Sequence, residues 1–237
     1  MMMSLTQHGA NLFRLARFGL VNSYLVREED GLTLIDANLP GSAPTILKAA
    51  RQIGLPILRI TLTHAHGDHI GSLDALRAAL PSAEVSISVR DARLLAGDLR
   101  VDAGEGPSKL KGDLRGAKTR PDRLLRGGDK VGSLRVVSAA GHTPGQLAFL
   151  DGRDGTLIAG DAFQVVGGLA VAGQLRWLFP FPALATWDDQ LAAESAARLT
   201  DLAPSRLAVG HGAVLENPVA AMQKAVEEAG RRGPKTA

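Results

Sequence analysis

Short apolar runs, rather than long ones, organise the beginning of the chain. Residues 11–18, 20–27 and 32–35 carry apolar side chains in the spacing that is typical of β-strands. The turn Glu29-Asp30-Gly31 separates the last two runs, and this arrangement predicts a hairpin. The chain is therefore expected to open with β-structure.

Helical spacing follows in the next segment. Ser42 stands where an N-cap is expected, helix-forming residues fill 44–51, and Gly54 marks the end of that helix. Apolar residues recur every three or four positions over 68–80, and Pro81 follows them. Two helices are therefore predicted in this part of the chain.

The second half of the chain repeats the alternation of strands and helices. Residues 97–128 are rich in glycine, aspartate and basic side chains, and they are predicted to form a long loop. Asp188 and Asp189 favour a helix at 187–202, because negative charge suits the first turn of a helix. The other predicted elements are strands at 57–63, 84–89, 131–137, 146–150, 155–159 and 206–209, a short helix from Asp91, and a last helix at 217–230.

The order of these elements predicts an α/β fold. Two similar halves agree with two sheets that pack face to face with helices outside. A chain of 237 residues is expected to form a single domain over 1–237, with a frayed tail at about 231–237.

Composition narrows the class of protein. Apolar residues make up 45% of the chain, but they form no run of the roughly 18 residues that a transmembrane helix needs. The first residues lack the basic stretch and apolar core of a secretory signal. The chain has no cysteine, which fits a reducing compartment and excludes thiolate ligands and a cysteine nucleophile. We therefore expect a cytoplasmic protein that does not bind membranes.

The charge pattern does not favour nucleic-acid binding. The formal net charge is only +3, and the basic residues of the segment 109–126 are interrupted by Asp113 and Asp122. No aromatic residue lies in that segment, whereas nucleic-acid binding usually needs a denser basic stripe or stacking aromatics. The segment is predicted to be a solvated loop, with a role in holding an anionic substrate as the alternative. A small-molecule substrate is expected, and no nucleic-acid partner.

Four potential metal ligands stand within six residues directly after the run 57–63. They form the sequence His64-Ala65-His66-Gly67-Asp68-His69. On an extended strand end His64 and His66 point the same way, and a following helix turn redirects Asp68 and His69 around the same point. Imidazole and carboxylate suit a divalent ion such as zinc, so this motif predicts a metal site with room for two ions.

Three further ligand-type residues each follow a β-like apolar run. His142 and His211 lie in glycine-rich turns after two of these runs, and Asp161 ends another. Residues that carry chemistry often gather on loops held by a rigid sheet. We therefore expect these three side chains to join the motif.

These motifs, taken in order, resemble those of the metallo-β-lactamase-fold superfamily. The ordered motifs are His-x-His-x-Asp-His, Gly-His-Thr-Pro-Gly, Gly-Asp and Gly-His-Gly, and the resemblance covers roughly residues 10–215. It implies a four-layer αββα sandwich and two divalent ions, most readily zinc, with manganese or iron as alternatives. In that assignment one ion is held by His64, His66 and His142, the second by Asp68, His69 and His211, and Asp161 bridges them.

The resemblance also implies a reaction. A hydroxide that bridges the two ions would attack a small ester, thioester or lactone, and Asp68 would pass a proton to the leaving group. The ligand set resembles glyoxalase II-like thioesterases and lactonases more than β-lactamases, which use a cysteine or lack the bridging aspartate. A phosphodiesterase or nuclease of the same superfamily, and a mononuclear iron sulfur dioxygenase, stay as alternatives.

Three departures limit the choice within the superfamily. Glyoxalase II has a C-terminal helical region for glutathione, and the 26 residues after His211 are expected to be too few to form it. The best-known lactonases have a tyrosine after the bridging aspartate, whereas the only tyrosine here is Tyr24. The flavodiiron branch has glutamate at the position of His66.

Aromatic residues concentrate shortly after Asp161. Five of the nine in the chain lie between Phe163 and Trp187, and this segment is predicted to form an apolar lid or pocket for an acyl group. The alternative is that the segment packs on the edge of the sandwich or against a second subunit, which leaves a homodimer open. The predicted pocket residues are Phe163, Trp177, Phe179 and Phe181.

Overall fold

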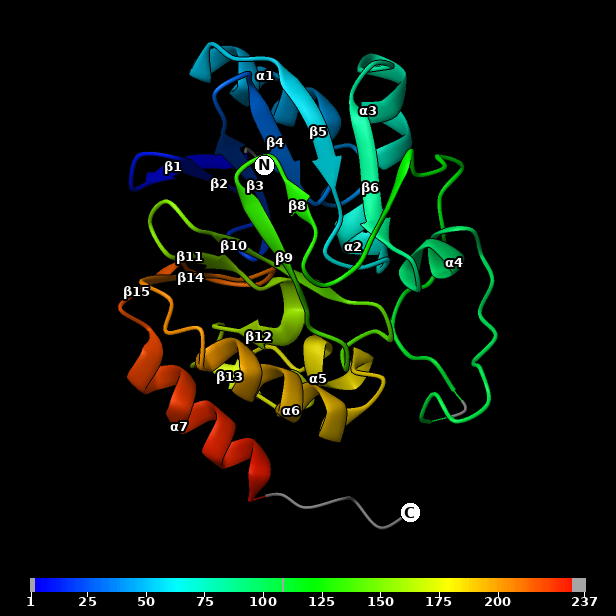
Figure 1. The fold of residues 1–237 in the computed structure, drawn as a ribbon, viewed down its shortest axis with the longest axis vertical. Coiled ribbons are helices and arrows are strands. Elements are labelled where there is room, and N and C mark those ends of the chain that lie inside the picture. Colours follow the sequence, from blue (N-terminus) through cyan, green and yellow to red (C-terminus); the bar gives the residue numbers. More distant parts are fainter. Residues whose placement is uncertain (1–2, 108, 232–237) are drawn as a thin grey trace.

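Two β-sheets form the centre of the computed structural model, which describes residues 3–107 and 109–231 (Figure 1). The strands of the first sheet lie in the order β1 (Ser4–His8), β2 (Leu12–Arg17), β3 (Val21–Arg27), β4 (Leu32–Ile35), β5 (Ile57–Thr61), β6 (Glu84–Ser88) and β7 (Arg123–Leu125). Those of the second lie in the order β15 (Leu215–Glu216), β14 (Arg206–Ala208), β11 (Thr156–Ile158), β10 (Leu147–Asp151), β9 (Leu134–Ser138) and β8 (Lys130–Val131). A separate hairpin pairs β12 (Phe163–Gln164) with β13 (Ala170–Val171).

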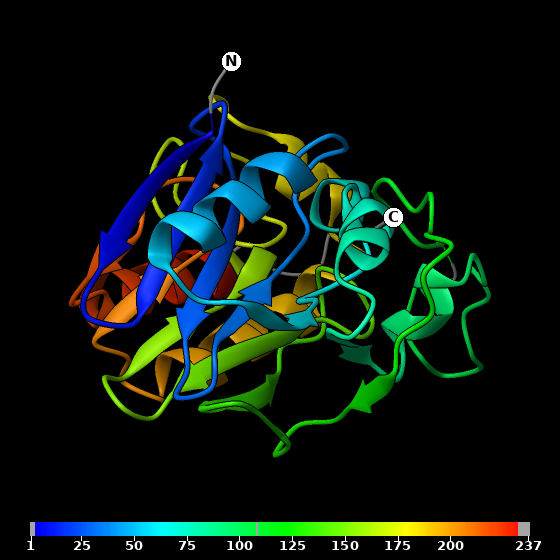
Figure 2. The same ribbon diagram turned by 90° about the horizontal axis from the view of Figure 1, so that it is seen from above.

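Helices cover the outer face of each sheet. The first sheet packs on α1 (Ala43–Ile53) and α3 (Leu73–Ala79), and the second on α6 (Asp189–Thr200) and α7 (Val219–Gly230) (Figures 1 and 2). The inner faces of the two sheets enclose a third core, which includes Tyr24, Ile35, Phe149 and Ile158. The predicted four-layer αββα sandwich is therefore confirmed. The shorter elements are α2 (Gly67–Ile70), α4 (Asp91–Leu95), α5 (Phe181–Ala185) and a 3₁₀ turn at Gly160–Ala162.

Parallel strands in both sheets determine where the motif residues lie. Strands β4 to β7 are parallel neighbours, and so are β11 and β14. Parallel neighbours require a crossover, and α1, α3 and α6 provide three of these on the outer faces. The loops that leave the carboxyl ends of β4, β5, β11 and β14 consequently meet at one end of the sandwich. Of the helices that the structure describes, none has both the length and the apolar character to cross a membrane.

Every predicted strand coincides with an observed one, although its ends shift by a few residues. The run 131–137 is divided between β8 and β9. The short strands β12, β13 and β15 were not predicted. In the first sheet, β1 was not predicted, and neither was β7 within the predicted loop 97–128. These are the edge strands of the first sheet, and β1 is largely exposed, so it lacks the apolar alternation that marks a buried strand.

The helix predictions need three corrections. Ser42 precedes α1, but its hydroxyl makes no capping bond, and its backbone has helical dihedrals (φ −84°, ψ −18°) rather than the extended ones of a typical N-cap. The hydroxyl instead accepts a hydrogen bond from the Arg17 guanidinium at 2.8 Å. Asp188 is the N-cap of α6 rather than a residue of its first turn, and its carboxylate accepts from the Leu191 amide at 3.0 Å. The helix predicted at 68–80 is broken into α2 and α3. The predicted frayed tail, beyond Arg231, lies outside the described residues.

Crowding at Gly71 accompanies this break. Gly71 ends α2 with φ of −60°, a value that any residue can adopt. A Cβ atom there would collide with the Pro40 ring and lie 2.8 Å from the Asn38 carbonyl oxygen. Glycine at this position therefore lets the motif helix pack directly against the loop that follows β4.

Gly71→Ala is expected to lower the melting temperature. Forcing one extra carbon into a packed site costs about 1–3 kcal/mol, and each kcal/mol is worth about 2–4 °C in a chain of this size. Gly230→Ala is the matched control, because nothing lies within 4 Å of the added carbon in α7. Thermal unfolding followed by circular dichroism compares the two variants, and a Gly71→Ala protein that melts with the wild type would contradict the packing argument.

Candidate metal centre

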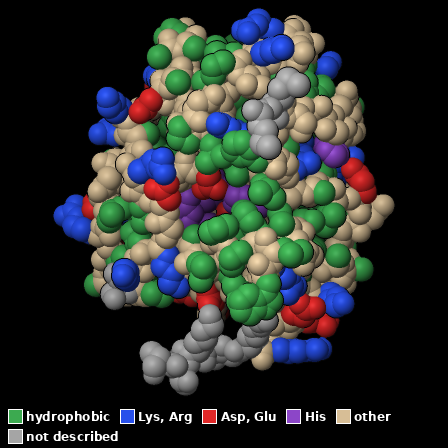
Figure 3. All heavy atoms as spheres, turned by 180° about the vertical axis from the view of Figure 1, so that it is seen from behind, with side chains coloured by type: hydrophobic (Ala, Val, Ile, Leu, Met, Phe, Trp, Pro, Cys, Tyr) green, Lys and Arg blue, Asp and Glu red, His purple; other side chains and the backbone are tan. Residues whose placement is uncertain are grey.

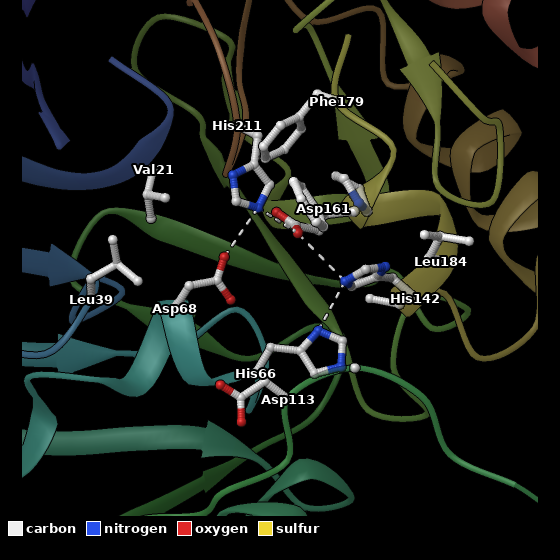
Figure 4. Close-up of a pocket in the computed structure, with 14 residues that line it drawn as sticks. Val21, Leu39, His66, Asp68, Asp113, His142, Asp161, Phe179, Leu184 and His211 are labelled. Atoms are coloured by element: carbon white, nitrogen blue, oxygen red, sulfur yellow. Dashed lines mark hydrogen bonds and ion pairs between the residues drawn. The ribbon is translucent and has the colours of Figure 1, made fainter. Parts of the chain in front are cut away.

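The seven predicted ligand residues come together at the end of the sandwich where the loops meet. Figure 4 labels His66, Asp68, His142, Asp161 and His211 among them. Those of the first motif follow β5 or lie in α2. His142 lies in the loop between β9 and β10, Asp161 in the 3₁₀ turn after β11, and His211 directly after β14. Six of the seven are buried, and Asp68 is partly exposed. The centre therefore lies at the junction of the two sheets.

Three groups of potential ligand atoms lie close enough to share an ion. His64, His66 and His142 form one group, and Asp68, His69 and His211 form another, with the atoms of each group within 4.8 Å of one another. These are the two sets implied by the family resemblance. Asp161 joins His64 and His69 in a third group. The structure thus brings the residues together as expected, while their binding of metal stays a prediction.

Asp161 lies between the two sets. Its Oδ2 atom is 3.4 Å from His142 Nε2 and 3.0 Å from His211 Nε2, and its Oδ1 atom is 3.4 Å from His69 Nε2. Gly210 leaves room for this carboxylate, since a Cβ atom at that position would overlap it. Figure 4 shows the resulting chain of contacts from Asp68 through His211, Asp161 and His142 to His66.

Asp36 orients one histidine of each set. Its carboxylate accepts hydrogen bonds from His69 Nδ1 at 2.8 Å and from the Thr63 hydroxyl at 2.7 Å. Because that hydroxyl gives its hydrogen to Asp36, it accepts one from His64 Nδ1 at 2.9 Å. His64 and His69 therefore both carry hydrogen on Nδ1, and in its neutral form each ring directs the lone pair of Nε2 inward.

The other three histidines are oriented by oxygen atoms in the same way. His66 Nε2 lies 3.0 Å from the Lys111 carbonyl oxygen, and His211 Nδ1 lies 3.3 Å from the Leu20 carbonyl oxygen. His142 Nδ1 lies 3.0 Å from the Thr186 hydroxyl. A carbonyl can only accept, so the hydrogens of His66 and His211 point outward. In the neutral form of each ring, the nitrogen that faces the centre then carries a lone pair.

This arrangement fits a divalent cation. His66 Nδ1 and His142 Nε2 face each other at 3.0 Å with their hydrogens bonded elsewhere. His64 Nε2, His69 Nε2 and Asp161 Oδ1 are buried and have no hydrogen-bond partner among the described residues. Buried polar atoms without partners are costly, and converging lone pairs repel one another, so a cation would satisfy them together.

The pKa shifts divide the centre into two parts. Burial lowers the pKa of His64 and His66 and lowers that of His142 to about 3, so these rings stay neutral. Burial also opposes charge on His69 and His211, but the carboxylates, Asp161 foremost, outweigh it. They raise the pKa of His69 well above its ordinary value and that of His211 to about 9. Without metal, protons on His69 and His211 therefore balance the carboxylates.

The centre opens into a cavity of about 390 Å³. Its apolar wall lies on both sides of the centre, with Val21 and Leu39 on one side and Leu184 on the other (Figure 4). The apolar wall is formed by Val21, Leu39, Phe179, Phe181, Pro182, Leu184 and Ala185. The Phe179 ring lies 5.0 Å from the His211 ring, measured between centroids. Figure 3 shows the histidines at the bottom of this hollow with hydrophobic side chains beside it.

Two of the four predicted pocket residues are not in this wall. Phe163 is fully buried in the core between the second sheet and its helices, because β12 directs its side chain toward them. Trp177 is 87% exposed and lies outside the cavity lining. The prediction is therefore wrong for these two residues, while Phe179 and Phe181 do line the cavity.

Asp91 is a second carboxylate that the sequence analysis missed as part of the site. It accepts hydrogen bonds from the Ala65 amide at 3.1 Å, the Thr143 hydroxyl at 2.7 Å and the Gly145 amide at 2.8 Å. Burial raises its pKa to about 6. Asp91 thus ties the loop of His64 and His66 to the loop of His142.

Comparison with known proteins agrees with this geometry. The family model of the metallo-beta-lactamase superfamily matches residues 16–211. The uncharacterized protein YobT of Bacillus subtilis (strain 168) is 53% identical over 210 residues, which cover 88% of this chain and 90% of YobT. A hydroxyacylglutathione hydrolase of Rhodopseudomonas palustris (strain BisA53) is 29% identical over 146 residues, which cover 61% of this chain and 48% of that enzyme.

Solved structures also match over most of their length. The protein TTHA1623, crystallised in a di-iron-bound form, matches with a TM-score of 0.63 and 29% identity. The match covers 85% of this chain and 92% of TTHA1623.

The metal-free protein is expected to lose stability as the pH rises from 6.5 to 9. The folded-state pKa of His211, about 9, lies above the ordinary value of 6.5, so its stabilising charge is fully present below pH 6.5 and is lost as the pH passes 9. Metal binding needs deprotonated ligands, so the stabilisation gained from metal grows over the same interval. Thermal unfolding with and without a chelator measures both trends. A metal-free melting temperature that stays level or rises would contradict the assigned charges, and His211→Asn should flatten the slope.

Proposed function

The chain belongs to the metallo-beta-lactamase superfamily, and from that premise we propose that it is a dinuclear metal-dependent hydrolase of a small ester, thioester or lactone. The position of Asp161 carries the proposal, because one carboxylate lies between two sets of inward lone pairs. Zinc is the first choice for both ions, given the nitrogen and oxygen ligands. The two irons of TTHA1623 make iron the alternative, with manganese also compatible.

Two ions held there would supply Lewis-acid charge and lower the pKa of a water molecule enough to make it a nucleophile at neutral pH. The protein's own contribution includes proton transfer by Asp68. Burial opposes ionisation of this carboxyl group, but His69 and His211 hold its pKa below the usual range, so it is ionised at neutral pH. Its side chain is 31% exposed and lines the cavity, where it can accept a proton and give it to a leaving group.

The cavity walls favour a partly apolar substrate. The apolar wall can receive an acyl group and exclude water from it. Similarity to a hydroxyacylglutathione hydrolase supports a thioester as one member of the substrate class.

Metal analysis combined with a substrate panel tests the proposed function. We expect two ions per chain and hydrolysis of p-nitrophenyl esters, acyl thioesters or acyl lactones. One iron per chain with oxidation of a persulfide would support a sulfur dioxygenase instead. Faster hydrolysis of bis-p-nitrophenyl phosphate than of every ester, thioester and lactone would support a phosphodiesterase.

Asp161→Ala is expected to lose metal and activity while keeping its fold. The substitution removes the carboxylate that both sets share, and the cores of the sandwich lie elsewhere. Losing such a ligand should reduce turnover by at least about 100-fold. Elemental analysis and circular dichroism accompany the assay, and two bound ions with wild-type turnover would exclude the bridging role.

The apolar wall predicts a preference for longer acyl chains. Each fully buried methylene is worth about 0.8 kcal/mol, or roughly a fourfold increase in kcat/KM. Phe181→Ala and Leu184→Ala should weaken this dependence and leave the metal content unchanged. Trp177→Ala is the matched control, because Trp177 lies outside the wall. An ester series from acetate to octanoate measures the dependence of kcat/KM on acyl-chain length. If this dependence were the same in all variants, the apolar wall would have no role in substrate selection.

A further inference from the structure

Thr186 connects the apolar wall to a metal-site histidine. It is fully buried and follows directly after α5. Its hydroxyl oxygen lies 2.7 Å from the Pro182 carbonyl oxygen and 3.0 Å from His142 Nδ1. Pro182 belongs to the cavity wall, and His142 belongs to the first ligand set.

The hydrogens of this pair of contacts can be assigned without ambiguity. A hydroxyl group has one hydrogen, and a carbonyl oxygen can only accept. The Thr186 hydroxyl therefore donates to Pro182 and accepts from His142 Nδ1. His142 Nε2 is left with a lone pair, which faces His66 Nδ1 at 3.0 Å and Asp161 Oδ2 at 3.4 Å.

The backbone beyond Thr186 holds the same loop. The Trp187 amide donates to the His142 carbonyl oxygen at 3.0 Å, and the Asp188 amide donates to the Gly141 carbonyl oxygen at 2.9 Å. These two bonds fix the main chain of the loop, but they leave the imidazole ring free to rotate about its side-chain bonds. The Thr186 hydroxyl supplies the contact that fixes the ring.

The same hydroxyl also closes α5. The last carbonyl groups of a helix have no partner within it, and α5 is a helix of only five residues. The backbone amide of Thr186 makes only a long bond of 3.4 Å to the Ala183 carbonyl oxygen. The bond from the hydroxyl to Pro182 is shorter and closes the turn that carries Phe181, Leu184 and Ala185 into the wall.

We propose that Thr186 is a positioning residue that sets the tautomer and direction of His142 for the first metal and, with the same hydroxyl, holds the α5 wall against the centre. The role of Thr186 in holding the wall rests on the proposed function, whereas its role in orienting His142 for metal binding does not. Thr186 touches neither substrate nor metal, so it acts only through His142 and Pro182.

A pair of substitutions separates the hydroxyl from the shape of the side chain. Thr186→Val keeps the shape and removes both hydrogen bonds, whereas Thr186→Ser keeps the hydroxyl. Loss of an outer hydrogen bond to a metal-binding histidine typically weakens metal affinity by about 10- to 100-fold. In Thr186→Val, a zinc titration against a chromophoric chelator should therefore show that the affinity for one of the two zinc ions is weaker by about that factor. Thr186→Ser should stay within about threefold of the wild type.

Histidine tautomers in the wild-type protein provide a test that needs no variant. Long-range ¹H–¹⁵N spectra of the metal-free protein near neutral pH should show His142 with hydrogen on Nδ1. This measurement uses the wild-type protein, so it tests the proposal even if Thr186→Val fails to fold. The proposal would be overturned if His142 carried its hydrogen on Nε2 instead. It would also be overturned if a folded Thr186→Val protein bound zinc with wild-type affinity, or if Thr186→Val and Thr186→Ser lost zinc affinity equally.

Ester kinetics test the wall separately. In Thr186→Val the KM for p-nitrophenyl hexanoate should rise more than the KM for the acetate, because a loosened α5 affects only the longer chain. Equal changes in the KM values for the hexanoate and the acetate would contradict the proposed role of Thr186 in holding the apolar wall. If no ester, thioester or lactone is hydrolysed by the wild type, the proposed function fails, while the zinc titration and the tautomer still decide the role of Thr186.

Discussion

The convergence of seven electron-rich side chains in a buried space is the constraint on which the rest of this structure depends. Five imidazoles and two carboxylates meet there, and the inward nitrogens have their hydrogens bonded on the other side of the ring. Such a cluster is unfavourable unless positive charge lies within it. Protons can supply that charge only in part, since burial keeps the rings of the first set neutral.

A small number of oxygen atoms hold this cluster in place. The Asp36 carboxylate directs His69 itself and directs His64 through the Thr63 hydroxyl, so one group orients a member of each ligand set. Asp91 joins the two loops that contribute the first set. Because these acceptors lie outside the ligands, the geometry is preorganised before any ion binds.

The ligands could be predicted from the sequence because their spacing is local. The residues that orient the ligands, Asp36, Asp91 and Thr186, could not, because their contacts form only in the folded chain. The motif fits within six residues, and each later ligand follows an apolar run. Asp36 is 27 positions from Thr63, Thr186 is 44 from His142, and Asp91 is 52 from Thr143. Asp36 does end the run 32–35, the same signal that identified Asp161, but it has no neighbouring histidine in the sequence. The direction of Phe163 depends on the pairing of a two-residue strand, and the break at Gly71 depends on contact with Pro40, so local patterns could not predict them.

The ligands come from the two sheets of the sandwich, and this has a consequence for the chain as a whole. Residues after β5 meet residues after β9, β11 and β14, and an isolated bridge between Val21 and His211 joins the sheets beside them. A chain without cysteine cannot join its halves by a disulfide. Bound ions would act here as removable cross-links between distant parts of the chain. The amount of folded protein in a cell would then follow the supply of metal rather than the redox state of the compartment.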